Sequence, residues 1–242
     1  MTLKERFLKV IWPTTKCVVC GGKSEKRYPG LCKECLERME KHREKEIFCP
    51  RCGSFHPDTF KNCPRCYFDP PKFSVRGGLF CALPYDEDSR ILVKYLKYQN
   101  RRDLAETMAK LFFRHSEIDS DFDVVTAVPL HKTRQKERGY NQSEIFARYI
   151  AEGMGLPYET FLIRNVNTVS QTKLPYQQRL HNLEGAFSVW SAENVKGKRI
   201  LLVDDVVTTG ATVKECAAVL KAAGAKRVGI AAFAAGRAKE SY

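Results

Sequence analysis

One short stretch, Ile200 to Thr212 (ILLVDDVVTTGAT), constrains the fold more than any other part of the chain. Its first four residues are apolar and predict a short strand buried on both faces, which is the pattern of a parallel sheet. Asp204 and Asp205 follow at the carboxyl end of this strand, where open α/β sheets bind ligands. The apolar periodicity from Val213 to Leu220 then predicts a helix. The chain is therefore expected to be an α/β protein with a site at this end of the strand.

The loop between this strand and this helix offers a cradle for an anion. A glycine lets backbone N–H groups approach a phosphate closely, and the following helix N-terminus adds partial positive charge. Thr212 and Glu215 also fit a capping box, which predicts that the helix begins at this threonine. The two aspartates are suited to ribose hydroxyl groups or to hydrated Mg²⁺. The residues expected to bind the phosphate are Thr208, Thr209, Gly210, Ala211 and Thr212.

This stretch resembles the loop of type I phosphoribosyltransferases that binds phosphoribosyl pyrophosphate (PRPP). The shared pattern is four apolar residues, two acids, two variable residues and TTGAT. The resemblance implies that Asp204 and Asp205 are catalytic residues that hold the 2′- and 3′-hydroxyl groups of PRPP, and that the loop binds its 5′-phosphate. The residues alone leave one alternative, an ordinary strand, turn and capped helix, which needs neither adjacent acids nor three threonines.

Eight of the ten cysteines form four CxxC pairs in one part of the chain, a spacing typical of metal sites. Each CxxC turn can direct two thiolates toward one tetrahedral ion, which predicts two structural Zn²⁺ sites. Sequential pairing would make two zinc ribbons and alternate pairing a cross-brace, and sequential pairing is favoured because its loops are shorter. Redox-active cysteines are the weaker alternative. The expected ligands are Cys17, Cys20, Cys32, Cys35, Cys49, Cys52, Cys63 and Cys66.

Two prolines within residues 68–72 predict a linker, which divides the chain into a zinc-binding module at 1–72 and an α/β domain at 73–242. Residues 1–12 have helical amphipathic spacing and are expected to pack on the module, with a short anchor at a membrane surface as the alternative. In the α/β domain, strands are expected over 78–83 and 227–233, and amphipathic helices over 87–98 and 102–115.

The segment 37–46 is almost wholly charged and predicts a solvated helix, with a nucleic-acid surface that includes Lys41, Arg43 and Lys45 as the alternative. His42 and His56 are expected on the solvent side because the cysteines already complete both metal sites. Aromatic residues of the module could stack bases, although packing in a small core is favoured for each. They are Phe48, Phe55, Phe60, Tyr67 and Phe68.

The formal net charge of +13 suggests a polyanionic partner. Each zinc bound by four thiolates would contribute −2, which lowers this charge to +9. No apolar run reaches the ~18–20 residues of a membrane span, and no signal peptide is recognisable. A soluble cytoplasmic protein without an integral membrane segment is therefore expected.

A second cluster follows the predicted strand over 124–128. Cationic side chains crowd a predicted loop at the end of that strand, a position that suits pyrophosphate, although a solvated loop is the alternative reading. Gly139 is expected to turn the chain, and Asn141 to cap a helix that runs to Met154. By resemblance this is the pyrophosphate loop, and its candidate residues are His131, Lys132, Arg134 and Arg138.

A polar stretch from Gln171 to Phe187 joins strand-like segments at 161–164 and 186–189. An insertion of this length suggests a functional loop, and type I phosphoribosyltransferases close a flexible loop over the substrate at this point in the chain. By that resemblance, Lys173 and Arg179 could reach the diphosphate.

Three features together resemble the ComF (ComFC) family of natural competence: RGYNQ at 138–142, the QT…R…NLEGAF block at 171–187 and the N-terminal CxxC pairs. The resemblance implies a type I phosphoribosyltransferase fold behind a small zinc-binding module with four cysteines per metal site, and PRPP with Mg²⁺ as ligands. It also implies a role in taking up and handling single-stranded DNA with the helicase and uptake proteins of competence. The expected location is the cytoplasm, with a peripheral position on the inner face of the membrane left open.

Two functions remain open from the sequence. The first is a pentosyltransferase in which an unidentified nucleophile displaces pyrophosphate from C1 of PRPP. The second is a non-catalytic adaptor that binds single-stranded DNA and uses PRPP as a regulatory ligand. The segment 73–118 and the zinc module are expected to form the hood over the site, but they carry no pattern that names the nucleophile. A transcription regulator is disfavoured because no helix-turn-helix pattern is visible.

Overall fold

A four-stranded sheet forms the centre of the protein, whose computed structural model describes residues 15–68, 77–119, 121–166 and 185–238. The strand order is β3-β8-β7-β4, and every neighbouring pair is parallel. This confirms the predicted α/β class. The strands are β3 (Leu79–Pro84), β4 (Val124–Ala127), β7 (Arg199–Val207) and β8 (Arg227–Ala235). We call the end at which these strands begin the amino edge, and the end at which they finish the carboxyl edge.

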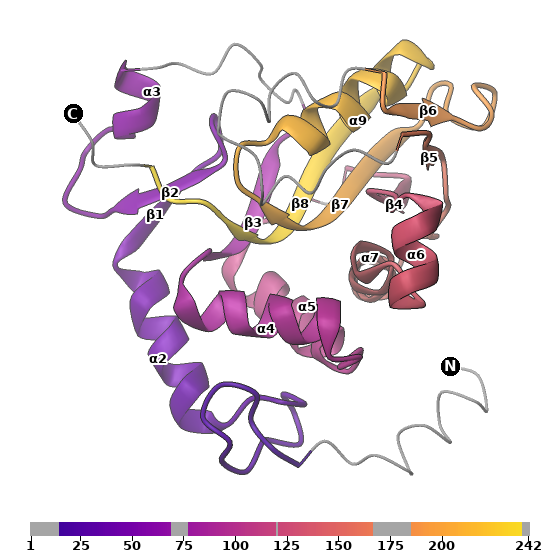
Figure 1. Cartoon of the computed structure of the whole chain (residues 1–242). Coiled ribbons are helices and arrows are strands. Elements are labelled where there is room, and N and C mark those ends of the chain that lie inside the picture. The colour runs from indigo at the N-terminus through magenta and orange to yellow at the C-terminus, as the bar shows by residue number, and fades with distance from the viewer. Residues whose placement is uncertain (1–14, 69–76, 120, 167–184, 239–242) are drawn as a thin grey trace.

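Helices cover both faces of this sheet (Figure 1). One face carries α4 (Glu87–Tyr98), α5 (Leu104–His115) and α7 (Gln142–Met154), and the other carries α9 (Ala211–Ala222). Strand β7 alternates between the two cores: Leu201 and Val203 pack with the three helices, whereas Ile200 and Leu202 pack with α9. This alternation explains why the strand is apolar at every position. Within the described ranges, no helix is long and apolar enough to cross a bilayer.

Side-chain hydrogen bonds to the backbone fix where two of the helices begin. The Asp86 carboxylate accepts a hydrogen bond from the Ser89 N–H at 3.0 Å, and the Ser89 hydroxyl accepts one from the Asp86 N–H at 2.9 Å, which fixes the start of α4. The side chain of Asn141 accepts from the Ser143 N–H at 3.1 Å and caps α7, as predicted. Helix α7 ends at Gly155, whose φ of 66° suits glycine.

The cationic segment after β4 is a helix, α6 (Lys132–Arg138), so the predicted loop is wrong there. The ring Nδ1 of His131 accepts a hydrogen bond from the Thr133 N–H at 3.2 Å, and Gly139 ends the helix with a φ of 79°. Lysine, arginine, glutamine and glutamate are all good helix formers, and they dominate this segment. A short antiparallel pair, β5 (Leu162–Arg164) and β6 (Phe187–Val189), matches the two predicted strands.

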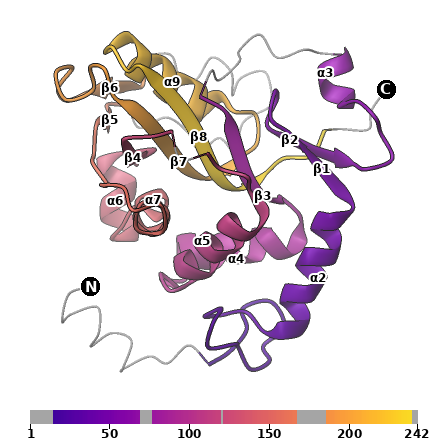
Figure 2. The ribbon, with the colours of Figure 1, turned by 180° about the vertical axis from the view of Figure 1, so that it is seen from behind.

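The zinc module contains α2 (Lys33–Glu44), β1 (Glu46–Cys49), β2 (Ser54–Pro57) and α3 (Pro64–Phe68), with β1 and β2 antiparallel. Figure 2 shows α2 beside α4. The predicted helix over 1–12 and most of the predicted linker, residues 69–72, lie outside the described residues. The boundary at residue 72 therefore stays a prediction.

The module packs firmly on the α/β domain. The Arg38 guanidinium donates to both carboxylate oxygens of Asp88 at 2.8 Å each, which joins α2 to α4. Most of the segment 37–46 is exposed, in agreement with the predicted solvated helix, although Met39 is buried on the inner face of α2 together with Leu36. Arg43 points inward as well and donates to the Ala82 carbonyl at 3.0 Å, whereas the two neighbouring lysines of the weighed nucleic-acid surface are exposed.

Two aromatic residues of the module test further expectations, one of which is wrong and one confirmed. His56 is buried and its Nδ1 lies 3.0 Å from the Pro57 carbonyl oxygen, so its predicted solvent position is wrong. Phe55 is fully buried, in agreement with core packing. Its N–H donates to the Gly236 carbonyl at 3.0 Å, and the Ala238 N–H donates to the Phe55 carbonyl at 2.8 Å. The second half of the module is thereby joined to the segment that follows β8.

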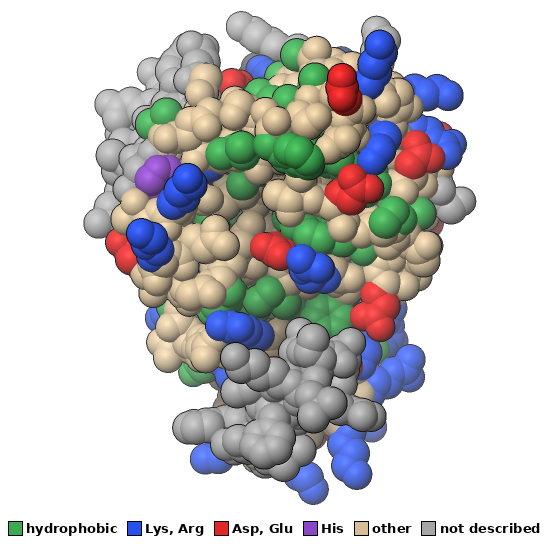
Figure 3. Space-filling model, turned by 90° about the vertical axis from the view of Figure 1, so that its right-hand side faces the viewer, with side chains coloured by type: hydrophobic (Ala, Val, Ile, Leu, Met, Phe, Trp, Pro, Cys, Tyr) green, Lys and Arg blue, Asp and Glu red, His purple; other side chains and the backbone are tan. Residues whose placement is uncertain are grey.

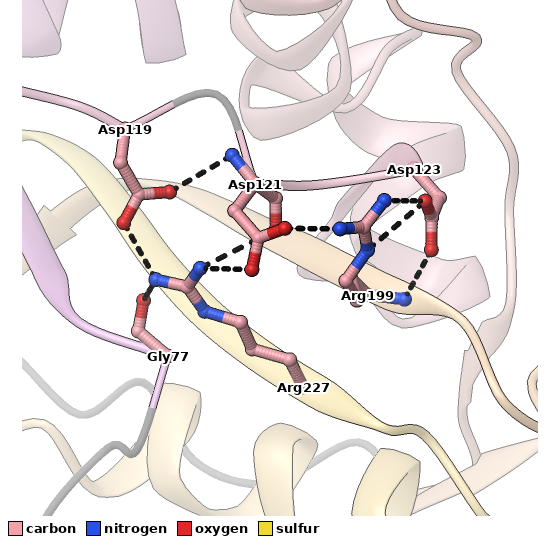
Figure 4. A network of polar contacts seen from close by, with 6 residues as sticks. All are labelled: Gly77, Asp119, Asp121, Asp123, Arg199 and Arg227. Carbon is pink, nitrogen blue, oxygen red and sulfur yellow. Dashed lines mark hydrogen bonds and ion pairs between the residues drawn. The ribbon is translucent and has the colours of Figure 1, made fainter.

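Ion pairs close the amino edge of the sheet (Figure 4). Arg227, the first residue of β8, donates to Asp119 at 2.6 Å and to Asp121 at 2.8 Å. Arg199, the first residue of β7, donates to Asp123 at 3.1 Å through Nε and at 2.8 Å through its backbone N–H, and it also pairs with Asp121. These acids lie on the segment that enters β4, so the network fastens three parallel strands at their start.

Candidate functional site

Two clusters of four cysteines lie in the zinc module. In each cluster the four Sγ atoms lie within 4.8 Å of one another. Burial, with hydrogen bonds and charge from the neighbouring thiols, holds the pKa of Cys35 well above its usual value, so the four sulfurs can ionise together only around a cation. Both clusters fit tetrahedral Zn²⁺, and sequential pairing is confirmed. The first cluster is Cys17, Cys20, Cys32 and Cys35, and the second is Cys49, Cys52, Cys63 and Cys66.

The two predicted catalytic acids lie in the last part of β7 and are buried, with Asp204 9% and Asp205 3% exposed. The sequence suggested that these acids follow the strand. The strand instead extends past them to Val207, so both acids lie within it. Because side chains alternate along a strand, Asp204 continues the α9 face and Asp205 the face of α4 and α7. Asp204 lines a hollow together with residues 206–213.

Three residues that the sequence did not assign to the site hold these acids. The Ser143 hydroxyl donates to Asp204 Oδ1 at 2.8 Å, and the Gln142 side-chain amide donates to Asp205 Oδ1 at 3.2 Å. The ammonium group of Lys97, near the end of α4, forms an ion pair with Asp205 Oδ2. One signal was present in the sequence, because Gln142 closes the RGYNQ motif and Ser143 follows it directly.

Burial and pairing act differently on the two carboxyl groups. Burial and the charge of Asp205 raise the pKa of Asp204 to about 7. Burial also opposes ionisation of Asp205, but the charge of Lys97 and its hydrogen bond outweigh it and lower the pKa of Asp205 below its usual value. At neutral pH the site therefore holds one ionised, paired acid and a second acid, facing the hollow, that is close to its titration point.

The loop after β7 is an open cradle of backbone N–H groups. Among the described residues, the N–H groups of Thr208, Thr209 and Gly210 have no hydrogen-bond partner. Gly210 has a φ of 78°, which only glycine adopts readily, and a Cβ there would meet no atom within 4 Å. The loop leads directly into α9, so unpaired donors and a helix N-terminus converge on one place.

The predicted capping box at the start of α9 is wrong. The helix begins at Ala211, with Gly210 as its N-cap, and Thr212 lies in its first turn. The Glu215 carboxylate instead accepts a hydrogen bond from the Gly185 N–H at 3.1 Å, which ties α9 to the segment before β6. The threonine hydroxyl of the first turn is therefore not the group that sets the helix start.

The cationic residues of α6 meet the site at one point. Arg138 donates to the Gln142 side-chain carbonyl, and its guanidinium carbon lies 5.0 Å from the centre of the Tyr98 ring. Through Gln142 this arginine is connected to Asp205. His131 is the N-cap of α6, and the other two candidates, Lys132 and Arg134, lie on that helix. Two further candidates, Lys173 and Arg179, lie outside the described residues, so their roles stay predictions.

Comparisons with known proteins agree with both parts of the chain. Residues 7–67 match a family model described as double zinc ribbon domain, and residues 141–241 match one described as phosphoribosyl transferase domain. The chain is 27% identical over 221 residues to competence protein F of Haemophilus influenzae and 31% identical over 221 residues to the DNA utilization protein YhgH of Salmonella typhimurium. Each alignment covers 88% of this chain and 93% of the relative.

A third relative aligns over a shorter stretch. The competence protein ComFC of Bacillus subtilis is 33% identical over 112 residues, which is 46% of this chain and 41% of that protein. The predicted architecture, a zinc module followed by a phosphoribosyltransferase-type domain, is confirmed by these matches together with the parallel sheet and the two cysteine clusters.

Proposed function

Because the chain belongs to the family of competence protein F and the DNA utilization protein YhgH, we propose that its phosphoribosyltransferase domain binds PRPP with Mg²⁺ and transfers the phosphoribosyl group. The observation that supports this most strongly is the row of unpaired N–H groups at 208–210 beside a buried acid that lines the same hollow. An anion cradle and an acceptor for hydroxyl groups are the two things that a ribose 5-phosphate requires.

In this proposal the 5′-phosphate accepts hydrogen bonds from the loop N–H groups, where the N-terminus of α9 adds partial positive charge. Asp204 accepts hydrogen bonds from the ribose hydroxyl groups and so fixes the sugar with C1 accessible. The bond between C1 and pyrophosphate breaks as a bond to the nucleophile forms, and pyrophosphate leaves with the bonding electrons. Arg138 and the other cations of α6 offset charge that builds on the leaving group.

The donor set at the hollow also fits the magnesium ion that accompanies a diphosphate. Mg²⁺ prefers hard oxygen ligands and keeps several waters, and Asp204 is the carboxylate that lines the hollow. When bound, the ion would neutralise charge on the diphosphate. Asp205, already paired with Lys97, is the less available ligand.

Two measurements test the proposal. Calorimetry of the full chain with PRPP and Mg²⁺ should give saturable binding, and binding should require both. A pyrophosphate-release assay with nucleobases, nucleotides and short single strands as acceptors should then show release above the background with metal alone. Binding without release from any acceptor would leave PRPP as a regulatory ligand, and absence of binding would refute the proposal.

A second candidate is an adaptor that binds single-stranded DNA and works with uptake proteins in the cytoplasm. A cationic surface with one exposed ring beside the acid pair favours it: Tyr98 is 65% exposed against Arg138, and the guanidinium carbon of the exposed Arg102 lies 4.4 Å from the centre of the buried Tyr140 ring. Stacking on an exposed ring next to arginine is how single strands are bound without sequence preference. Figure 3 views the molecule from the side on which Figure 1 labels α6, and basic and acidic side chains are interspersed there, which argues for a local contact rather than a continuous basic stripe.

Fluorescence anisotropy with a labelled single strand tests this candidate. Binding should weaken steeply as salt rises, since phosphate contacts release counterions. Tyr98→Ala should reduce affinity several-fold, whereas Tyr67→Ala, which removes a 74% exposed ring on the zinc module, should not. The reverse order would assign the contact to the module, and a flat salt dependence would contradict DNA binding by this surface.

A further inference from the structure

Lys97 is brought to the acid pair from outside the part of the chain that matches the phosphoribosyl transferase model, residues 141–241. Its side chain is 23% exposed and that of its partner Asp205 only 4%, so the ion pair is largely removed from water. A lysine would leave such a position for solvent unless the carboxylate held it, and burial without a partner would be costly for either group.

The end of α4 is fixed from two directions. The hydroxyl of Tyr140 donates to the Leu96 carbonyl, and Arg138 lies over the ring of Tyr98. At the other end of the helix, Asp88 receives both hydrogen bonds from Arg38 of the zinc module. The position of Lys97 is therefore set by its helix, independently of any ligand.

The contacts of the two acids differ, although the Ser143 hydroxyl of α7 reaches both. Asp205 pairs with Lys97 through Oδ2, and its Oδ1 accepts from the Gln142 amide at 3.2 Å and from the Ser143 hydroxyl at 3.4 Å. Asp204 lines the hollow, and its Oδ1 accepts from the Ser143 hydroxyl at 2.8 Å and from the Asp205 N–H at 2.9 Å. Two adjacent acids thus have different surroundings.

We propose that Lys97 is a positioning residue of the PRPP site: it holds Asp205 on the helical face, so that Asp204 alone meets the ligand. This inference rests on the function proposed above. Lys97 acts through Asp205 and does not touch PRPP, and the two acids of the motif are not equivalent. Asp204 accepts from the ribose, whereas Asp205 anchors the end of β7 to α4 and α7.

The test is a double-variant cycle on the full chain, with Mg²⁺–PRPP affinity measured by calorimetry. Lys97→Met should weaken binding about tenfold or more, because loss of one partner from a buried charge pair leaves the other unpaired. Lys97→Arg, which keeps the charge, should stay within about threefold of the wild type. Asp204→Asn should weaken binding more than Asp205→Asn. In the Asp205→Asn background, Lys97→Met should have no further effect, because the group it acts on is already neutral.

Three outcomes would overturn the inference. Wild-type affinity in Lys97→Met would show that the ion pair does not matter for binding. An equal loss from Lys97→Met in both backgrounds would show that Lys97 acts without Asp205, for example by direct contact with the diphosphate. A larger loss from Asp205→Asn than from Asp204→Asn would reverse the assigned roles.

Failure of the proposed function looks different, because the wild-type chain itself would then bind no PRPP, and this inference would fall with it. If Lys97→Met does not fold, the comparison of Asp205→Asn with Lys97→Met/Asp205→Asn decides the question, since this double variant removes both charges of the ion pair together. Thermal unfolding of every variant serves as the control for folding.

Discussion

The two edges of the same sheet both gather aspartates and basic residues, and they treat them in opposite ways. At the amino edge the acids are solvent-accessible and each is bonded to an arginine that begins a strand (Figure 4). At the carboxyl edge Asp204 and Asp205 are buried, and the ammonium group of Lys97 pairs with Asp205. The amino-edge groups are Asp119, Asp121, Asp123, Arg199 and Arg227.

We interpret this difference as one between a structural arrangement at the amino edge and the proposed ligand site at the carboxyl edge. Exposed pairs contribute little each and leave no charge uncompensated. A buried carboxyl group without its own cation lowers the free energy of unfolding. Proteins retain such unfavourable groups mainly at sites where they bind a ligand. The pKa values diverge accordingly: hydrogen bonds from Arg199 lower the pKa of Asp123 to about 2, whereas burial raises that of Asp204 to about 7.

The sharpest way to break the comparison is to neutralise both acids at each edge. Asp204→Asn with Asp205→Asn should weaken Mg²⁺–PRPP binding at least about a hundredfold, because hydrogen bonds to charged groups contribute ~1.5–3 kcal/mol each. Asp121→Asn with Asp123→Asn should leave the affinity unchanged. Calorimetry measures both, and an unchanged affinity in the first variant would refute the site assignment.

The pH dependence of stability should have opposite signs at the two edges. The pKa of Asp204 in the folded chain, about 7, lies above the usual 3.8, so this group makes the free energy of unfolding fall as pH rises from about 4 to about 7. The pKa of Asp123 lies below 3.8, so its contribution is present above about pH 4 and is lost as pH falls toward 2.

Denaturant unfolding across this pH range, without ligand, checks the signs. Asp204→Asn should be more stable than the wild type near pH 7, and the gain should vanish near pH 4. Asp123→Asn should be less stable near pH 7 and match the wild type near pH 2. A loss of stability in Asp204→Asn at neutral pH would mean that this carboxylate braces the fold.

A matched pair of glycines sharpens the comparison further. Gly210 in the loop after β7 and Gly197 just before β7 have φ values of 78° and 77°, and neither would bring a Cβ within 4 Å of another atom. Replacement by alanine should cost each about 1 kcal/mol of stability through backbone strain. Only Gly210→Ala should also weaken PRPP binding, by several-fold, as the N–H groups shift. Equal effects on affinity would contradict a phosphate cradle at this loop.

The smallest effect is expected at the amino edge. Arg227→Met should lower the free energy of unfolding by about 1 kcal/mol or less, since exposed pairs are weak. The difference from the wild type should shrink in high salt, which screens such charges. PRPP affinity should not change. A large decrease in the free energy of unfolding that does not depend on salt would mean that these ion pairs behave as buried pairs.

Much of the architecture follows from local patterns. Four consecutive apolar residues at 200–203 predicted a strand that is buried on both faces of the sheet. The CxxC spacing predicted that cysteine pairs adjacent in the sequence form one cluster. The helix expected over 87–98 has those same limits in the structure, because Asp86 and Ser89 provide its cap. In each case the cause lies within a few residues of the effect.

The site itself depends on contacts that no local pattern contains. Lys97 and Ser143 reach the acid pair from separate helices, and only the packing of α4 and α7 on β7 brings them together. The prediction for the segment 132–138 was wrong for a different reason. Its crowded charges were interpreted as a loop, although its residues favour a helix. His56 was expected at the surface because a histidine outside a metal site gives no sign of burial.

The hydrogen bonds between Phe55 and the segment after β8 have a consequence for biosynthesis. A ribosome releases the chain from its N-terminus, so the cysteine clusters can load metal long before residues 236–238 exist. Until then the backbone N–H and carbonyl of Phe55 lack these partners, although Phe48 and Arg43 of the module can already pack on its ring. At ~5–20 residues per second the wait is on the order of ten seconds or more, during which the nascent ribbon presents an unpaired strand edge.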